Sequence, residues 1–250
     1  MKEIYLSEID STQRYLIEAL PFDGPHEGMA VYSFNQYSGK GQANKTWTSA
    51  PDAGIALSVA FPFSKDLEID WVLMNKHLCT GVIQFLQQHV DPRFSLKWPN
   101  DVIVSDRKLG GMIMNIVPKS KVQYLVLGLG LNIQQPPDLP QAIGINEIST
   151  SKDFQLVAFT KKIIDFLLDH LSILPDSTTH QIYNSLLWKL NQTVMVNEIE
   201  SNEASTNKIS QKTFKGVDEH GRAIFEFNHE TMIMHHGKAH ILLPPINLNS

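Results

Sequence analysis

The sequence predicts an α+β fold, in which a larger domain of strands and helices precedes a small all-β domain. As far as Leu190, apolar runs typical of strands are interspersed with stretches of helical periodicity. Beyond Leu190, only short strand patterns separated by polar turns remain, which is typical of a small β-barrel. We therefore expect one domain over residues 1–188 and a second over residues 189–250.

The larger domain is expected to begin with a short helix, because Asp10, Ser11 and Thr12 precede apolar residues at helical spacing. A strand over 29–34 and a buried strand over 55–61 should flank a polar, glycine-containing loop at 38–44. Apolar residues recur at helical spacing across 68–90 and predict a long helix. Further strands are expected at 94–97, 102–104, 111–117 and 123–129, and further helices at 154–173 and 180–190.

The small domain should contain strands at 193–196, 213–217, 223–227, 231–234 and 240–243. Polar turns separate these runs, and one turn contains His220 and Gly221.

Composition narrows the class of function. The net charge is −5 and the isoelectric point is near 6.0, which argues against a general nucleic-acid binder. Cys79 is the only cysteine, so no intrachain disulfide can form. The N-terminal segment lacks a signal-peptide pattern, and no run approaches the ~20 apolar residues that span a bilayer. We expect a cytoplasmic protein that binds neither membrane nor DNA.

The predicted loop at 38–44 contains Gly39, Lys40, Gly41 and Gln42. Glycines let the backbone approach a ligand closely, and a lysine among clustered N–H groups would bind phosphate or carboxylate oxygens. The spacing matches neither a P-loop nor a dinucleotide fingerprint. A flexible surface loop is the alternative interpretation.

Two further segments gather polar residues beside glycines. Residues 97–101, of sequence Lys-Trp-Pro-Asn-Asp, are followed by Asp-Arg-Lys-Leu-Gly-Gly at 106–111. Rigid strands aim polar side chains well, although a solvated hairpin with a charged turn is the simpler interpretation. Residues 128–132, Gly-Leu-Gly-Leu-Asn, end an apolar strand, where paired glycines often indicate close approach of a ligand. The asparagine there is equally suited to satisfying its own backbone in a turn.

Taken together, these motifs resemble those of the biotin protein ligases in order and spacing. They are residues 11–13, Gln36 with the 39–47 loop, and the runs at 97–101, 108–111 and 128–132. The resemblance extends over about residues 5–135 and more weakly through the C-terminal domain. It implies a mixed sheet with flanking helices, like that of class II aminoacyl-tRNA synthetases, followed by an SH3-like barrel. Many relatives also carry an N-terminal DNA-binding winged helix, but the first motif begins at Ser11, so we expect the ligase-only form.

The resemblance also implies the reaction. Such an enzyme forms biotinoyl-AMP from biotin and ATP, with Mg²⁺ accompanying the triphosphate, and transfers biotin to a lysine of a biotin carboxyl carrier domain. It would act as a monomer or a homodimer. A lipoate or octanoate ligase of the same superfamily and a non-catalytic biotin or nucleotide sensor remain as alternatives.

Site residues follow from the resemblance, position by position. Those implied to bind biotin are Ser11, Thr12, Gln13, Gln36, Gly39, Lys40, Lys108 and Gly111. Those implied to bind ATP or the adenylate are Gly41, Gln42, Trp47, Lys97, Asn100 and Asn132. Those implied to be catalytic are Lys40, Asn100, Asp101 and Lys108. No protein residue is implied with certainty as a metal ligand.

Several of these assignments leave alternatives or depart from the family pattern. Ser11 and Thr12 also suit a helix N-cap, and Trp47 also suits the core. Asp101 is equally consistent with a base, a metal ligand or a structural group. Lys40 stands where the family usually has arginine, and Asn44 where a glycine is common. Lysine keeps the charge but lacks the bidentate fork of arginine, so retention of the adenylate is expected to differ.

Overall fold

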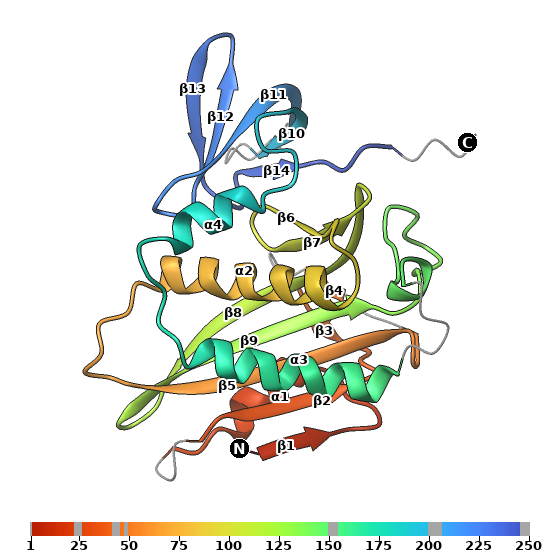
Figure 1. Ribbon diagram of the computed structural model, residues 1–250, viewed down its shortest axis with the longest axis vertical. Helices are drawn as coiled ribbons and strands as arrows, with labels where there is room; N and C mark the ends of the chain where they lie inside the picture. Colours follow the sequence, from red (N-terminus) through yellow and green to blue (C-terminus); the bar gives the residue numbers. More distant parts are fainter. Residues whose placement is uncertain are drawn as a thin grey trace.

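The computed structural model describes residues 2–22, 27–41, 46–47, 50–149, 155–199 and 207–245. Its centre is a seven-stranded mixed sheet of order β1-β2-β5-β9-β8-β7-β6 (Figure 1). The strands are β1 (Lys2–Tyr5), β2 (Met29–Ser33), β5 (Gly54–Ser64), β6 (Ser95–Lys97), β7 (Asp101–Val104), β8 (Arg107–Pro118) and β9 (Val122–Asn132). Only the β1–β2 pair within this sheet is parallel. A two-stranded hairpin, β3 (Gly39–Lys40) with β4 (Thr46–Trp47), lies apart from it.

Helices cover both faces of the sheet. The covering helices are α1 (Thr12–Ala19), α2 (Trp71–His89) and α3 (Leu156–Leu171), and α4 (Thr179–Ser185) packs on α2; a 3₁₀ helix, η2 (Ile145–Glu147), follows β9. In Figure 1, α2 and α3 lie in front of the sheet and α1 lies behind it. The side chain of Ser11 caps α1 and that of Asp70 caps α2, since each accepts a hydrogen bond from a first-turn N–H group.

Side chains of β9 alternate between the two faces, as strand geometry requires. Its odd-numbered leucines, Leu125 to Leu131, join the main core with α2 and α3. Tyr124 and Val126 point to the opposite face and pack with Leu16 of α1 and with Leu20, which directly follows this helix. Gly128 and Gly130 continue that second face but have no side chains. Helix α1 therefore packs on the apolar part of this face, and the neighbouring part has no side chains of its own from β9; we call this part the glycine strip (Gly128 and Gly130).

The C-terminal region forms a five-stranded antiparallel sheet of order β13-β12-β11-β10-β14. Its strands are β10 (Thr193–Ile199), β11 (Asn207–Val217), β12 (Ala223–Phe227), β13 (Glu230–Met234) and β14 (Ala239–Ile241). Phe214 and Phe225 belong to the same apolar cluster as the leucines of β9, so the core continues between the two sheets. The indole Nε1 of Trp98 donates to the carbonyl of Gly221 at 3.0 Å, which ties the sheets together.

The predicted α+β class is confirmed, and each strand expected after Leu190 is present. Among the details that differ, three stand out. The edge strand β1 was not expected, because Lys2–Tyr5 is too short and too polar to stand out. Helix α4 ends at Ser185 instead of near 190, and the expected loop at 38–44 includes the short strand β3. No helix in the described ranges is long and apolar enough to cross a membrane.

Candidate active site

The first group of predicted site residues lies where α1 begins. Ser11 accepts a hydrogen bond from the backbone N–H of Arg14 at 3.3 Å, which is the capping role considered for it. The backbone N–H of Thr12 donates to Gln36 Oε1 at 2.8 Å, and the Thr12 hydroxyl lies 3.2 Å from the same oxygen. Thr12 and Gln36 are both buried, so they form a preorganised polar pair.

A second layer of polar side chains lies behind Thr12. The Ser58 hydroxyl is 3.0 Å from that of Thr12 and donates to Gln13 Oε1 at 2.9 Å. Gln13 in turn donates to Asn115 Oδ1 at 3.0 Å and to the carbonyl of Val126 at 3.3 Å. Sequence reasoning missed Ser58 and Asn115. Ser58 was detectable as the one hydroxyl within the apolar strand predicted at 55–61.

The β3–β4 hairpin contacts the glycine strip. A Cβ atom on Gly130 would lie 2.7 Å from the indole ring of Trp47, so only glycine lets the ring rest there. A Cβ atom on Gly39 would collide with the side-chain amide of Gln36. Lys40 is exposed on the same hairpin, and Gly41 follows it. Gln42 and Asn44 lie outside the described residues.

An ion cluster lies at the other side of the strip. Asp101 accepts from Lys97 Nζ through Oδ2 at 2.9 Å and from Lys108 Nζ through Oδ1 at 2.5 Å. Burial alone would raise the pKa of Asp101, but the charges of the two lysines and their hydrogen bonds outweigh burial and lower it. The Lys108 side chain is 38% exposed whereas that of Lys97 is 12% exposed, so Lys108 is the cation that a ligand reaches first.

Strand register explains how these residues meet. Lys97 pairs with Asp101, Asp101 with Gly111, and Gly111 with Gly130. Directly paired residues of antiparallel strands project to the same face. Because Gly111 has no side chain, its place is open to the ion cluster: a Cβ there would lie 3.4 Å from Asp101 Oδ1 and 3.7 Å from Lys108 Nζ.

The two predicted asparagines are anchored by the backbone. Asn100 Nδ2 donates to the carbonyl of Met112. Asn132 Nδ2 donates to the carbonyl of Ile143 at 3.3 Å and lies 3.5 Å from that of Lys108. Asn132 therefore joins the end of β9 to Lys108 and to the loop at Ile143, and not to its own backbone in a turn, which was the alternative considered for it.

The site combines a net positive ion cluster with uncharged hydrogen-bonding groups. Two ammonium groups face one carboxylate, and the glycine strip separates them from the pair formed by Thr12 and Gln36. Such a surface suits a molecule that is anionic at one end and carries an uncharged polar group at the other. Within the described ranges, no three His, Cys, Asp or Glu side chains gather as metal ligands do.

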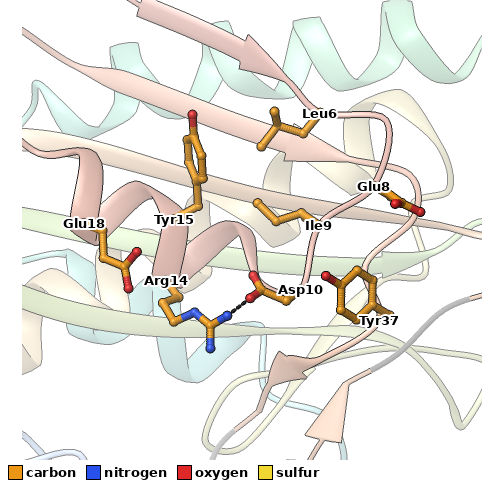
Figure 2. Close-up of a pocket in the computed structure, with 8 residues that line it drawn as sticks. All are labelled: Leu6, Glu8, Ile9, Asp10, Arg14, Tyr15, Glu18 and Tyr37. Carbon is orange, nitrogen blue, oxygen red and sulfur yellow. Dashed lines mark ion pairs between the residues drawn. The ribbon is translucent and has the colours of Figure 1, made fainter.

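A cavity of about 360 Å³ lies elsewhere, on the outer side of α1 (Figure 2). Its lining is Leu6, Glu8, Ile9, Asp10, Arg14, Tyr15, Glu18 and Tyr37. None of these is a predicted site residue. Three carboxylates oppose one arginine, and that arginine is paired with Asp10. This cavity therefore suits an anionic substrate poorly, and we place the candidate site at the glycine strip.

Comparison with known proteins identifies the family of the chain. A model of the biotin/lipoate A/B protein ligase family matches residues 5–132, which is more than half of the chain. The chain belongs to this family. The matched range contains both polar layers at Thr12, the hairpin, the ion cluster and the glycine strip.

Individual relatives are similar at lower identity. Human biotin–protein ligase is 28% identical over 176 residues, covering 67% of this chain and 24% of that protein. The bifunctional ligase/repressor BirA of Bacillus subtilis is 26% identical over 154 residues, covering 59% of this chain and 45% of that protein. The chain thus spans less than half the length of these relatives. The structure of biotin protein ligase from Aquifex aeolicus in complex with biotin and ATP shares the fold, with a TM-score of 0.73, 23% identity and coverage of 97% and 99%.

Proposed function

We propose that the chain is a biotin protein ligase, which joins biotin to AMP and then transfers it to a lysine of a biotin carboxyl carrier domain. The observation that carries the proposal is the arrangement along the glycine strip. The ammonium group of Lys108, held by Asp101, lies on one side of it, and the pair of Thr12 and Gln36 lies on the other. Biotin has the matching polarity, with a carboxylate at one end and a neutral ureido ring at the other.

In the first step, the biotin carboxylate attacks the α-phosphate of ATP and pyrophosphate leaves. Both reactants are anions, so the site must reduce their repulsion. Lys108 supplies a positive charge where carboxylate and phosphate meet, and Lys97 adds a second, more buried charge. Lys40, on the neighbouring hairpin, is suited to holding the phosphate of the adenylate.

In the second step, the carrier lysine attacks the acyl carbon and AMP leaves. Trp47 lies against Gly130, where its ring is suited to covering the nucleotide. We assign Asn132 and Asn100 to the adenylate and phosphate side, where they hold backbone segments. Ser11, Gly39, Gly111, Gly41 and Gln42 complete the proposed set of contacts. Gln13, which was also expected to bind biotin, lies in the second polar layer, and we propose that it acts through Ser58 and Thr12.

The geometry favours an anchoring role for Asp101. Both of its oxygens accept from lysine ammonium groups. A carboxylate so engaged is a weak base and a poor partner for Mg²⁺. We therefore propose that Mg²⁺ is held chiefly by the phosphate oxygens of ATP.

Two observations support biotin as the acid. The human relative and the Aquifex structure are named for biotin ligation, and that structure was solved with biotin and ATP. The hydroxyl and amide groups of Thr12 and Gln36 also suit a ureido ring. The family includes lipoate ligases, so a lipoate or octanoate ligase is the second candidate.

Mass spectrometry of a carrier domain tests the proposal. We expect incubation with biotin and MgATP to add the mass of biotin less one water, on a single lysine. Lipoate and octanoate in place of biotin are expected to give no such gain. A gain with lipoate alone would favour the second candidate, and nucleotide binding without any transfer would favour a sensor. Size-exclusion chromatography with light scattering would distinguish a monomer from a homodimer.

A further inference from the structure

The hydrogen-bond network behind Thr12 has a fixed direction, and this direction begins at Gln13. One side of the Gln13 amide faces the carbonyl of Val126, which can only accept a hydrogen bond. The group facing Val126 must therefore be Nε2, and Oε1 must face Ser58. Gln13 is 8% exposed and Ser58 1% exposed. Bulk water therefore does not compete with these groups for their hydrogen bonds, and each keeps its role as donor or acceptor.

The direction passes from Gln13 to Thr12 through Ser58. Gln13 Oε1 only accepts, so the Ser58 hydroxyl uses its single hydrogen to donate to it at 2.9 Å. Toward the Thr12 hydroxyl, 3.0 Å away, Ser58 can then only accept. The hydrogen of Thr12 is shared between Ser58 Oγ and Gln36 Oε1, both of which are acceptors. Thr12 therefore offers a ligand only the lone pairs of its oxygen.

Gln36 is oriented by a second backbone group. The N–H of Thr12 can only donate, and it bonds Gln36 Oε1 at 2.8 Å. Gln36 Nε2 consequently points away from Thr12 and lies toward Gly39. The hydrogen-bonded pair thus carries an acceptor on one side chain, Thr12 Oγ1, and a donor on the other, Gln36 Nε2.

We infer that Gln13 and Ser58 are specificity-determining residues that commit the Thr12 hydroxyl to accepting, so that the site selects acids whose ring carries an N–H group beside a carbonyl. A cyclic urea has this pattern, whereas a dithiolane or a plain alkyl chain lacks it. The inference rests on the proposed function. It adds that selection originates one layer behind the residues that touch the ring.

Acids that place an acceptor against Thr12 should bind weakly. The suitable probes are two biotin analogues in which either ureido N–H is replaced by a ring oxygen, giving cyclic carbamates. Replacement at the position facing Thr12 leaves two acceptors in contact within a buried site. We expect the unaltered chain to bind that analogue at least about tenfold more weakly than biotin.

The test measures Kd by titration calorimetry for biotin and both carbamates, without ATP. Gln13→Met removes the acceptor that fixes Ser58, and Ser58→Ala removes the relay itself. Either change gives the Thr12 hydrogen more freedom to turn toward a ligand. The quantity compared is the Kd of the carbamate altered at the position facing Thr12, divided by the Kd of biotin. We expect this ratio to fall by about threefold or more in both variants, mainly through better carbamate binding.

Thr160→Val is the matched control. Thr160 is also fully buried, but its hydroxyl bonds the carbonyl of Leu156 within α3, on the opposite face of the sheet. This variant reports the general cost of losing a buried hydroxyl and should keep the ratio of the unaltered chain. Thermal unfolding of all variants monitors folding.

Two outcomes would overturn the inference. The first is a ratio of carbamate Kd to biotin Kd near one in the unaltered chain, and the second is an unchanged ratio in both variants. The proposed function would fail differently: the unaltered chain would not bind biotin or transfer it to a carrier domain.

Discussion

At the scale of single residues, the position of Lys108 yields the clearest prediction. We expect Lys108→Ala to lower adenylate formation by about a hundredfold or more, because an electrostatic contact to the reacting oxygens is lost. Thermal unfolding should change little, since Lys97 still pairs with Asp101. Biotin-dependent release of pyrophosphate from ATP measures the effect.

Lys215→Ala is a control for this prediction. The Lys215 side chain is 41% exposed, and its Nζ lies 4.0 Å from Glu226 Oε2 in the C-terminal sheet. The variant therefore removes a lysine of similar exposure from an ion pair that lies away from the glycine strip. Pyrophosphate release by Lys108→Ala at the rate of the control would remove Lys108 from the mechanism.

Asp101 leads to a prediction about pH. Because its pKa is lowered in the folded protein, the Asp101 carboxylate stays charged there. This stabilises the fold at pH values above about 4, the ordinary pKa of an aspartate in the unfolded chain. That contribution is lost only as the pH falls through the lower folded pKa. Between pH 5.5 and 8.5, Asp101 therefore does not titrate.

We expect Asp101→Asn to reduce kcat by a constant factor across that interval, because both lysines lose their anchor at every pH. Stopped assays of carrier biotinylation at several pH values give kcat for the unaltered chain and for the variant, and the two values are compared as a ratio at each pH. A ratio that rises with pH along one ionisation would indicate that Asp101 acts as a base.

At the scale of elements, strand β9 separates two functions along its length. A Cβ at Gly128 would lie 2.5 Å from Gln13 Oε1, whereas one at Gly130 would lie 2.7 Å from Trp47. We expect Gly128→Ala to weaken biotin binding more than ATP binding, and Gly130→Ala to do the reverse. Calorimetric titration with each ligand checks this, and each variant is the control for the other. Equal losses in both variants would contradict the division.

The elements themselves could largely be predicted from the sequence because their apolar periodicity is strong. The strand predicted at 55–61 is β5, and the helix predicted at 68–90 is α2. The network around Gln13 could not be predicted. Asn115 lies 102 positions along the chain from Gln13, and Ser58 lies 45 positions away. No local pattern reports a hydrogen bond over such separations.

The ion cluster was partly predictable. Lys97 and Asp101 are close in the chain, and both were expected at the site. Lys108 was expected near the reacting groups, but its bond to the same carboxylate depends on an irregularity in the β7–β8 pairing after Val102. A bulge of this kind is set by the packing of both strands and has no signature in this sequence.

At the scale of the whole molecule, the two sheets are joined by polar as well as apolar contacts. Lys76 of α2 is buried and donates to the carbonyls of Asp218 and Glu219, at 2.7 and 3.1 Å. Burial lowers the pKa of Lys76, and the nearby carboxylates of Asp218 and Asp70 oppose that change. The division at 188/189 thus stays a prediction from sequence, across which the core continues.

Deletion of residues 191–250 is therefore expected to abolish cooperative unfolding. Lys76 would lose the carbonyl partners at Asp218 and Glu219, and Trp98 would lose its acceptor at Gly221. Circular dichroism during heating measures the transition. A truncated chain that unfolds sharply at the temperature of the full chain would show that the first region is independent.

The changing cover of β9 has a consequence for ligand binding. Helix α1 packs against Tyr124 and Val126, whereas Trp47, from the short β3–β4 hairpin, covers Gly130. A bound acyl-nucleotide would extend this smaller cover, and the molecule would gain stability while it carries its cargo.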